Sequence, residues 1–448
     1  MTLRPLPVYA LLVILFLGST TTQAIQIKIP KSITLKDESG LTFTVADPTS
    51  TGEISIDDKS KQCLTDAFET AGEAWHVNIS AGGVTLFANQ YTTVTPLARG
   101  QALGLGTIKN SAQTVNILVI DKFGTTTFPL KENKSGPELQ MTLNHGGLVV
   151  AHIREILKAD NNRVQIRTLD IDDIHPGSAN ASVTTADVVN ALQNKWSRLE
   201  INFNLPLIIN LSIAILPCEI QSHYFQLSNA AELLNPPRRL PFRKYLDGIA
   251  QLNGHGSDAA QYIKSIIVPS NLHDPLQKWL REQKTIWKSN RAPFVVVASS
   301  GNYGLPFQTM PAAWPEVLGV AASTVVKPTS KTYWSDAGDV LDVGEWYTFD
   351  RDPFNPSFNK IISATFINGS GNPTPYTTFQ RKDFAYRGTS FAAPTVTASL
   401  AIAMGKPSSL CFKAGTREFD FDPLSLKKGN LQGPIPVFST SYLRCLMP

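Results

Sequence analysis

From residue 114 onward, apolar runs of strand length alternate with longer amphipathic runs, and no other feature of the sequence constrains the fold as strongly. The apolar runs lack the regular alternation of a half-exposed strand, so each strand is expected to be buried on both faces. Strands that alternate with helices require crossover connections and hence a mostly parallel sheet. The pattern predicts an α/β domain over 106–405, a parallel sheet flanked by helices. Strands are expected at 114–121, 164–171, 206–215, 293–300 and 317–323, and helices at 145–160, 184–197, 276–289 and 389–404.

The segments around this sheet have different patterns. Residues 25–105 alternate apolar and polar residues at a period of two, which predicts a smaller, strand-rich N-terminal region with one helix over 60–75. We interpret residues 219–270 as an insertion between sheet elements. The last stretch, 406–448, is rich in Pro, Gly and Lys and is expected to form a C-terminal tail of loops or short strands.

The N-terminus predicts export. Arg4 precedes an apolar run over 8–18 that is too short to span a bilayer comfortably, and small residues follow up to Ala24. This pattern indicates a signal peptide over residues 1–24 and a secreted or periplasmic protein; an uncleaved anchor is the alternative. No later run has the length of a membrane helix, so no membrane span is expected in the mature chain.

The composition of the chain limits the classes of binding partner that are expected. With 42% hydrophobic and 17% charged residues the chain is globular, and a net charge of +4 over 448 residues is too small for a nucleic-acid partner. Asn-x-Ser sequons would matter only in a eukaryotic secretory pathway. The oligomeric state is left open. The sequons are Asn78, Asn133, Asn180, Asn210 and Asn368.

Export makes the four cysteines candidates for disulfides, and three full pairings are possible. Cys63 and Cys218 lie far apart in the chain. Cys411 and Cys445 both lie in the C-terminal tail, which has few helical signals and would be stabilised by a disulfide, so this pair is weakly preferred. Buried thiols remain the alternative.

Three reactive side chains lie where predicted strands end or predicted helices begin. Asp121 ends an apolar strand, His145 opens one helix and Ser390 opens another. Functional groups gather at the carboxyl edge of a parallel sheet, and a carboxylate, an imidazole and a hydroxyl there suit nucleophilic acyl transfer. Each also has an ordinary interpretation, as a turn former, a surface or capping histidine, and a helix N-cap.

A fourth residue could complete the set. Asn302 follows the apolar strand of "VVVASSGNYG" (295–304), between two glycines. Its amide could donate to a developing oxyanion together with the N–H of Ser390. A simple Asn-containing turn is the alternative.

Together these motifs resemble the subtilisin-like serine proteases (subtilases, peptidase family S8). "GTSFAAP" (388–394) is similar to the Ser motif of that family, "HGGLVVAHI" (145–153) to its His motif, "ILVIDKFG" (117–124) to its Asp motif and "VVVASSGNYG" to its oxyanion motif. The order Asp, His, Ser along the chain is the order of the subtilisin triad. Ser390 lacks the G-x-S-x-G turn of α/β-hydrolases, because Ala392 is its second following residue.

The resemblance implies an exported serine endopeptidase that hydrolyses polypeptides. Ser390 would be the nucleophile, His145 the base, Asp121 the residue that orients it, and Asn302 the oxyanion donor. "IINLSIA" (208–214) resembles the strand that lines the substrate cleft in the family, which implies substrate contacts at Ser212, Ile213 and Ala214.

The chain also departs from the family pattern. Lys122 and Phe123 follow the Asp, Gly147 and Leu148 replace the usual Thr and second His, and Ala214 replaces a Gly. These changes motivate an alternative, a catalytically weak subtilase scaffold that acts as a binding or surface-interaction protein.

Calcium binding and a removable prodomain are two further features of the family. Family members often bind calcium, but no acidic cluster here has a suitable loop spacing; residues 169–175 come nearest and are expected to form a turn. No cofactor or metal is therefore expected to be required. Residues 25–105 occupy the position of the removable prodomain of many subtilases, and a permanently attached region is the alternative.

Overall fold

The fold is described from a computed structural model. It describes residues 24–36, 42–47, 49–56, 61–65, 79–81, 84–86, 114–123, 126–130, 138–143, 145–157, 163–174, 183–232, 234, 240–269, 274–290, 292–323, 330–333, 335–343, 345–348, 362–367, 373–375, 384–405, 419–420 and 444–445. Among them, no helix has both the length and the apolar character needed to cross a bilayer. The predicted signal peptide lies almost entirely outside these ranges.

A six-stranded parallel sheet forms the centre of the molecule, as the sequence predicts. Its strand order is β11-β8-β12-β14-β15-β16, so the chain crosses over between strands rather than forming hairpins. Because all six strands run the same way, their carboxyl ends meet at one edge. The strands are β8 (Val115–Asp121), β11 (Val164–Asp170), β12 (Leu207–Leu211), β14 (Phe294–Ser299), β15 (Val317–Ser323) and β16 (Val340–Val343).

Alternate residues of the central strands pack against opposite helical layers. In β8, Ile117 and Val119 lie in one apolar cluster, whereas Leu118 and Ile120 lie in another. Both sets are fully buried, which explains the continuous apolar runs of the sequence. The sheet is therefore the middle of three layers.

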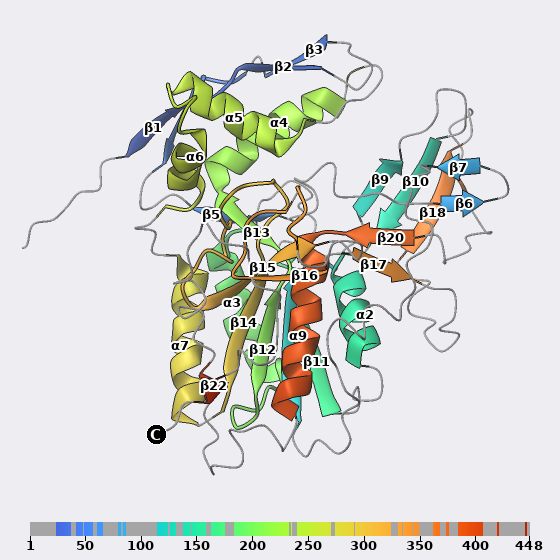
Figure 1. Cartoon of the computed structure of the whole chain (residues 1–448), viewed down its shortest axis with the longest axis vertical. Coiled ribbons are helices and arrows are strands. Elements are labelled where there is room, and N and C mark those ends of the chain that lie inside the picture. Colours follow the sequence, from blue (N-terminus) through green and yellow to red (C-terminus); the bar gives the residue numbers. More distant parts are fainter. Residues whose placement is uncertain are drawn as a thin grey trace, which may run out of the picture.

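Helices cover both faces of this sheet. One cluster joins it to α2 (His145–Leu157) and α9 (Thr389–Gly405), which lie side by side in Figure 1. The other joins it to α3 (Thr185–Lys195) and α7 (Pro275–Ser289). The 3-10 turn η2 (Trp196–Leu199) follows α3 directly. All four helices occur where the sequence predicts them.

The N-terminal region is rich in short strands, as expected, and packs on helices of the 219–270 segment. A third apolar cluster contains Ile27 and Val45 from the strands and Tyr224, Tyr245 and Ile263 from the helices. Figure 1 shows these strands beside α4 and α5, away from the central sheet. The elements are β1 (Ile25–Lys28), β2 (Ser32–Lys36), β3 (Thr42–Ala46), β4 (Glu53–Ile56), α4 (Cys218–Glu232), α5 (Phe242–Leu252) and α6 (Ala259–Ile267).

Smaller antiparallel sheets complete the described part of the chain. A four-stranded sheet has the order β19-β18-β10-β9, and β17 pairs with β20 just before α9. Their bounds are β9 (Thr126–Leu130), β10 (Glu138–Leu143), β17 (Glu345–Thr348), β18 (Ile362–Ile367), β19 (Pro373–Pro375) and β20 (Phe384–Arg387). Two-stranded pairs are β6 (Ile79–Ala81) with β7 (Val84–Leu86) and β21 (Phe419–Asp420) with β22 (Arg444–Cys445).

The structure corrects one predicted helix and one predicted strand. The expected helix over 60–75 is wrong at its start, where Gln62–Thr65 form the strand β5; residues 66–75 lie outside the described ranges. The apolar run 206–215 is two strands, because β13 (Ala214–Pro217) leaves the central sheet and pairs with β5. In residues 62–65, tertiary pairing with a distant strand outweighs the local helical pattern.

A disulfide joins Cys63 to Cys218, two residues separated by 155 positions. The weak preference within the tail concerned Cys411 and Cys445, and Cys411 lies outside the described residues. Only the fold brings β5 and the start of α4 together, so no local signal could have identified the bond.

Candidate active site

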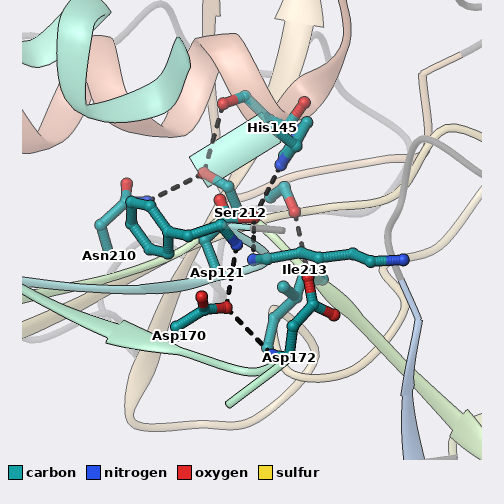
Figure 2. A network of polar contacts seen from close by, with 11 residues as sticks. Asp121, His145, Asp170, Asp172, Asn210, Ser212 and Ile213 are labelled. Carbon is teal, nitrogen blue, oxygen red and sulfur yellow. Dashed lines mark hydrogen bonds and ion pairs between the residues drawn. The ribbon is translucent and has the colours of Figure 1, made fainter. Parts of the chain in front are cut away.

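The carboxylate of Asp121 and the imidazole of His145 form a buried hydrogen-bonded pair. Asp121 ends β8 and His145 begins α2, and His145 Nδ1 lies 2.7 Å from Asp121 Oδ1 (Figure 2). The same oxygen accepts the backbone N–H of Lys122 at 2.7 Å. Burial raises the pKa of Asp121, and the charge and hydrogen bond of His145 oppose this rise. A histidine whose Nδ1–H points at a carboxylate keeps its basic lone pair on Nε2.

The residues that depart from the family pattern shape this pair. The Gly146 N–H donates to the Lys122 carbonyl at 2.7 Å, which ties the start of α2 to the end of β8. A Cβ at Gly146 would lie 2.8 Å from the ring of Phe123, so glycine is needed here because the aromatic side chain covers its Cα. The Phe123 ring therefore packs against the start of α2, directly beside His145.

Asp170 holds the loop that follows Asp121. It ends the neighbouring strand β11 in register with Asp121, and its Oδ1 accepts the N–H groups of Phe123 at 3.0 Å and Asp172 at 2.9 Å (Figure 2). Burial raises the pKa of Asp170. Residues 171–174 form the turn that was expected there. Within the described ranges, no group of three or more His, Cys, Asp or Glu could hold a metal ion.

Ser390 lies in the first turn of α9. Its side chain is 1% exposed, and its hydroxyl makes no hydrogen bond within the described part of the chain. The ring of the next residue, Phe391, makes an edge contact with the His145 ring at 6.1 Å between centroids. Further along, His152 Nε2 of α2 lies 2.8 Å from Thr395 Oγ1 of α9. The packing of α2 on α9 thus brings His145 to the Ser390 end of α9.

Asn302, in the loop after β14, contacts Thr389, the residue that precedes Ser390. Its Oδ1 accepts both the N–H and the hydroxyl of Thr389, each at 2.9 Å, which orients the amide. A Cβ at Gly388 would lie 2.9 Å from Ser390 Oγ and 3.5 Å from Asn302 Nδ2. The hydroxyl and the amide N–H₂ therefore flank the same small space beside Gly388.

The sequence prediction missed Asp336, which holds the Asn302 loop. Its Oδ1 accepts the N–H of Tyr303 at 3.0 Å and of Leu305 at 2.7 Å, and its own N–H donates to the Gly301 carbonyl at 2.9 Å. The side chain is fully buried, and burial raises its pKa well above the usual range. No local sequence pattern identifies Asp336, because its partners Tyr303 and Leu305 are separated from it in the chain by β15 and the adjoining loops.

Of the three predicted substrate-contact residues, Ser212, Ile213 and Ala214, only Ser212 has a hydrogen bond to Ser390 within the described part of the chain. Ser212 Oγ donates to the Ser390 carbonyl at 3.2 Å and accepts from Asn210 Nδ2 at 2.8 Å (Figure 2). The Ile213 carbonyl accepts from Ser299 Oγ at 3.3 Å. Ser212 thus supports the backbone of Ser390, and Ala214 begins the strand β13.

Asn210, the penultimate residue of β12, is 0% exposed. Its Oδ1 accepts from Thr397 Oγ1 of α9 at 2.9 Å. Its sequon is therefore closed to glycosylation in the folded protein. The other four sequon asparagines lie outside the described residues.

Comparisons with known proteins identify the family resemblance. A model of the subtilase family (Peptidase_S8) matches residues 247–414, which confirms the resemblance for the segment that carries Asn302 and Ser390. Asp121 and His145 lie outside the matched segment. The sequence matches no curated protein.

Similar solved structures include the prenylagaramide maturation protease PagA, at 16% identity with 69% of this chain and 79% of that chain covered and a TM-score of 0.30. The patellamide maturation protease PatA has 14% identity, with 70% and 84% covered and a TM-score of 0.30. Sphericase has 12% identity, with 69% and 84% covered and a TM-score of 0.28. At these scores the overlaps carry no weight for function.

Proposed function

We propose that the chain is an exported serine endopeptidase that hydrolyses peptide bonds with Ser390, His145, Asp121 and Asn302. The observation that carries the proposal is the buried Asp121–His145 hydrogen bond at the start of α2, where the His145 ring contacts Phe391, the residue that follows Ser390. The subtilase match over 247–414 supports the same reaction class. Secretion or periplasmic export follows from the N-terminal sequence pattern.

In the proposed reaction Ser390 Oγ attacks the carbonyl carbon of the substrate while His145 Nε2 takes the hydroxyl proton. Asp121 keeps the imidazole in the tautomer with the proton on Nδ1 and stabilises the imidazolium. The negative oxygen that forms is met by Asn302 Nδ2, whose orientation Thr389 sets, and by the Ser390 N–H at the start of α9.

The intermediate collapses when His145 returns the proton to the departing amine, which breaks the C–N bond and leaves an acyl ester on Ser390. Water then attacks the ester carbonyl and passes a proton to His145. The acid product leaves and the Ser390 hydroxyl is restored. These steps call for no metal or organic cofactor; the proposed partner is a polypeptide substrate.

A fluorophosphonate probe tests the nucleophile. Its phosphorus is attacked only by an activated hydroxyl, with fluoride as the leaving group, so we expect one label on the peptide that contains Ser390. Ser390→Ala and His145→Ala should both abolish labelling while the thermal unfolding transition remains. A folded wild-type protein that takes up no label would contradict the enzyme and favour the binding scaffold.

A further inference from the structure

The backbone edge of β13, which begins at the predicted substrate-contact residue Ala214, is already occupied by the chain itself. β5 pairs with β13 in antiparallel register, with Thr65 opposite Ala214 and Leu64 opposite Ile215. On the other side of β13, the Ile215 N–H donates to the Met310 carbonyl at 2.8 Å. A peptide can therefore add to β13 only where β5 now lies.

β5 is held on both of its edges, although it forms a two-stranded sheet with β13. On its far side the Leu64 N–H donates to the Val183 carbonyl at 2.8 Å, and Gln221 Nε2 of α4 donates to the Leu64 carbonyl at 3.0 Å. The Leu64 side chain is 7% exposed and belongs to the same apolar cluster as Ile213 and Ile215. An aliphatic side chain thus fills the position that a bound peptide strand would offer to this cluster.

The direction of β5 is that of an acyl-side substrate strand. It runs antiparallel to β13, from Pro217 toward Ala214, and so toward Ser212 and Ser390. The acyl half of a substrate reaches a nucleophile with its carboxyl-terminal end, because the carbonyl attacked belongs to its last residue. β5 presents its carboxyl-terminal end to the site in the same way.

A covalent bond keeps this strand in place. Cys63 of β5 is bonded to Cys218, the residue that follows β13, with 4.9 Å between the Cα atoms, and the Cys218 N–H donates to the Lys61 carbonyl at 2.9 Å. If the backbone is cut between β5 and β8, the disulfide still holds β5 to Cys218, next to β13. Removal of an N-terminal segment by proteolysis alone therefore does not open this edge.

We propose that β5 and the Cys63–Cys218 disulfide form a thiol-operated lock on the proposed protease site, and that the opened edge takes an extended peptide with an aliphatic residue in the place of Leu64. The proposal rests on the proposed function of Ser390. It adds that peptide access is gated by reduction.

The opening step needs a dithiol as co-reactant. One thiolate attacks Cys218 Sγ, because Cys218 is partly exposed whereas Cys63 is only 1% exposed. The S–S bond breaks and gives a mixed disulfide on Cys218 and the Cys63 thiolate. The second thiol of the reductant then displaces Cys218. Two electrons and two protons pass to the cysteines, and the dithiol leaves as its own disulfide.

The test measures binding rather than turnover, in the Ser390→Ala background. The probe is a fluorescent heptapeptide, Lys-Gln-Ser-Leu-Thr-Asp-Ala, which is residues 61–67 with Ser in place of Cys63. Fluorescence anisotropy is recorded for the oxidised protein, for the protein reduced with dithiothreitol, and for Cys63→Ser/Cys218→Ser with and without Leu64→Asp.

We expect affinity to rise at least tenfold when the disulfide is absent, and to rise again with Leu64→Asp, because that change expels the competing β5. A peptide with Asp in place of its Leu should lose the gain. The control Cys411→Ser/Cys445→Ser should respond to dithiothreitol like its parent. Equal affinity in oxidised and reduced protein, with unfolding transitions retained, would overturn the lock; the reduced parent protein decides the question if the cysteine variants do not fold.

Fluorophosphonate labelling of the same proteins with Ser390 restored separates the two proposals. Peptide binding that depends on reduction, without labelling in any state, would retain the lock and reject the protease. If Ser390 is labelled but the peptide affinity is the same in oxidised and reduced protein, the protease proposal is retained and the disulfide lock is rejected.

Discussion

Asn302 Oδ1 accepts two hydrogen bonds from Thr389, one from its backbone N–H and one from its hydroxyl, both at 2.9 Å. Thr389 directly precedes the proposed nucleophile, so one residue fixes both the start of α9 and the direction of the amide. With its oxygen engaged, the amide turns Nδ2 toward the space beside Gly388, where Ser390 Oγ lies. An oxyanion donor is effective only if it is oriented before the reaction begins.

We expect Asn302→Ala to lower kcat less than Ser390→Ala does. Loss of a single oxyanion donor typically costs about 10²–10³ in kcat, whereas loss of the nucleophile removes the acyl-enzyme route altogether. Steady-state peptide hydrolysis by the two variants checks this, with circular dichroism to confirm folding. Two folded variants that both match the wild-type rate would exclude the proposed site.

Thr389→Val should lower kcat by about tenfold and leave KM nearly unchanged. Valine keeps the shape but removes the hydroxyl, so Asn302 loses one of two donors and the Gly301 N–H loses its 3.3 Å contact with that oxygen. Thr389→Ser keeps the hydroxyl and should restore most of the rate. If serine and valine behave alike, the hydroxyl does not position the amide.

Gly388→Ala should abolish fluorophosphonate labelling and also lower the thermal midpoint, because Gly388 is buried and its φ of +158° strains any L side chain. The new Cβ would lie 2.9 Å from Ser390 Oγ, closer than real contacts allow, so it displaces the hydroxyl from the space it shares with Asn302 Nδ2. Gly256→Ala is the matched control, because a Cβ there meets nothing within 4 Å. Normal labelling of the Gly388 variant would contradict this geometry.

Asp336→Asn should make stability less dependent on pH. Burial raises the pKa of Asp336 in the folded protein, while its backbone donors and the charges of Lys331 and Arg243 oppose the rise. A raised pKa gives stability that is fully present below the ordinary aspartate range and is lost as pH rises through the folded value. Asparagine cannot ionise, so its thermal midpoint relative to wild type should improve between pH 4 and pH 8.

Asp336→Ala serves as the comparison for that experiment. Alanine removes the acceptor of the Tyr303 and Leu305 N–H groups, which costs about 1–3 kcal/mol for each buried donor left unsatisfied. It should be less stable than asparagine at every pH and should lower kcat, because the Asn302 loop loosens. An asparagine variant with the same pH profile as wild type would show that ionisation of Asp336 does not limit stability.

Much of the central domain could be predicted because its signals are local. A strand buried on both faces is a continuous apolar run, and an amphipathic helix repeats its apolar residues every three to four positions, so β8, β14, α2 and α7 occur where the sequence indicates. Asp121, His145, Asn302 and Ser390 stand where such elements end or begin, and the parallel sheet brings such positions to one edge. Their catalytic roles stay predictions.

Only the tertiary structure decided the contacts between distant parts of the chain. The residues expected to begin a helix at 60 form β5 instead, because backbone pairing with β13 and the bond from Cys63 to Cys218 outweigh a weak periodicity. Asp336 looks like an ordinary loop residue until the fold buries it against the Asn302 loop. By itself the sequence determined most of the central elements and the reactive groups at their ends; which strand pairs with β13 depends on free energies of packing between segments 155 residues apart.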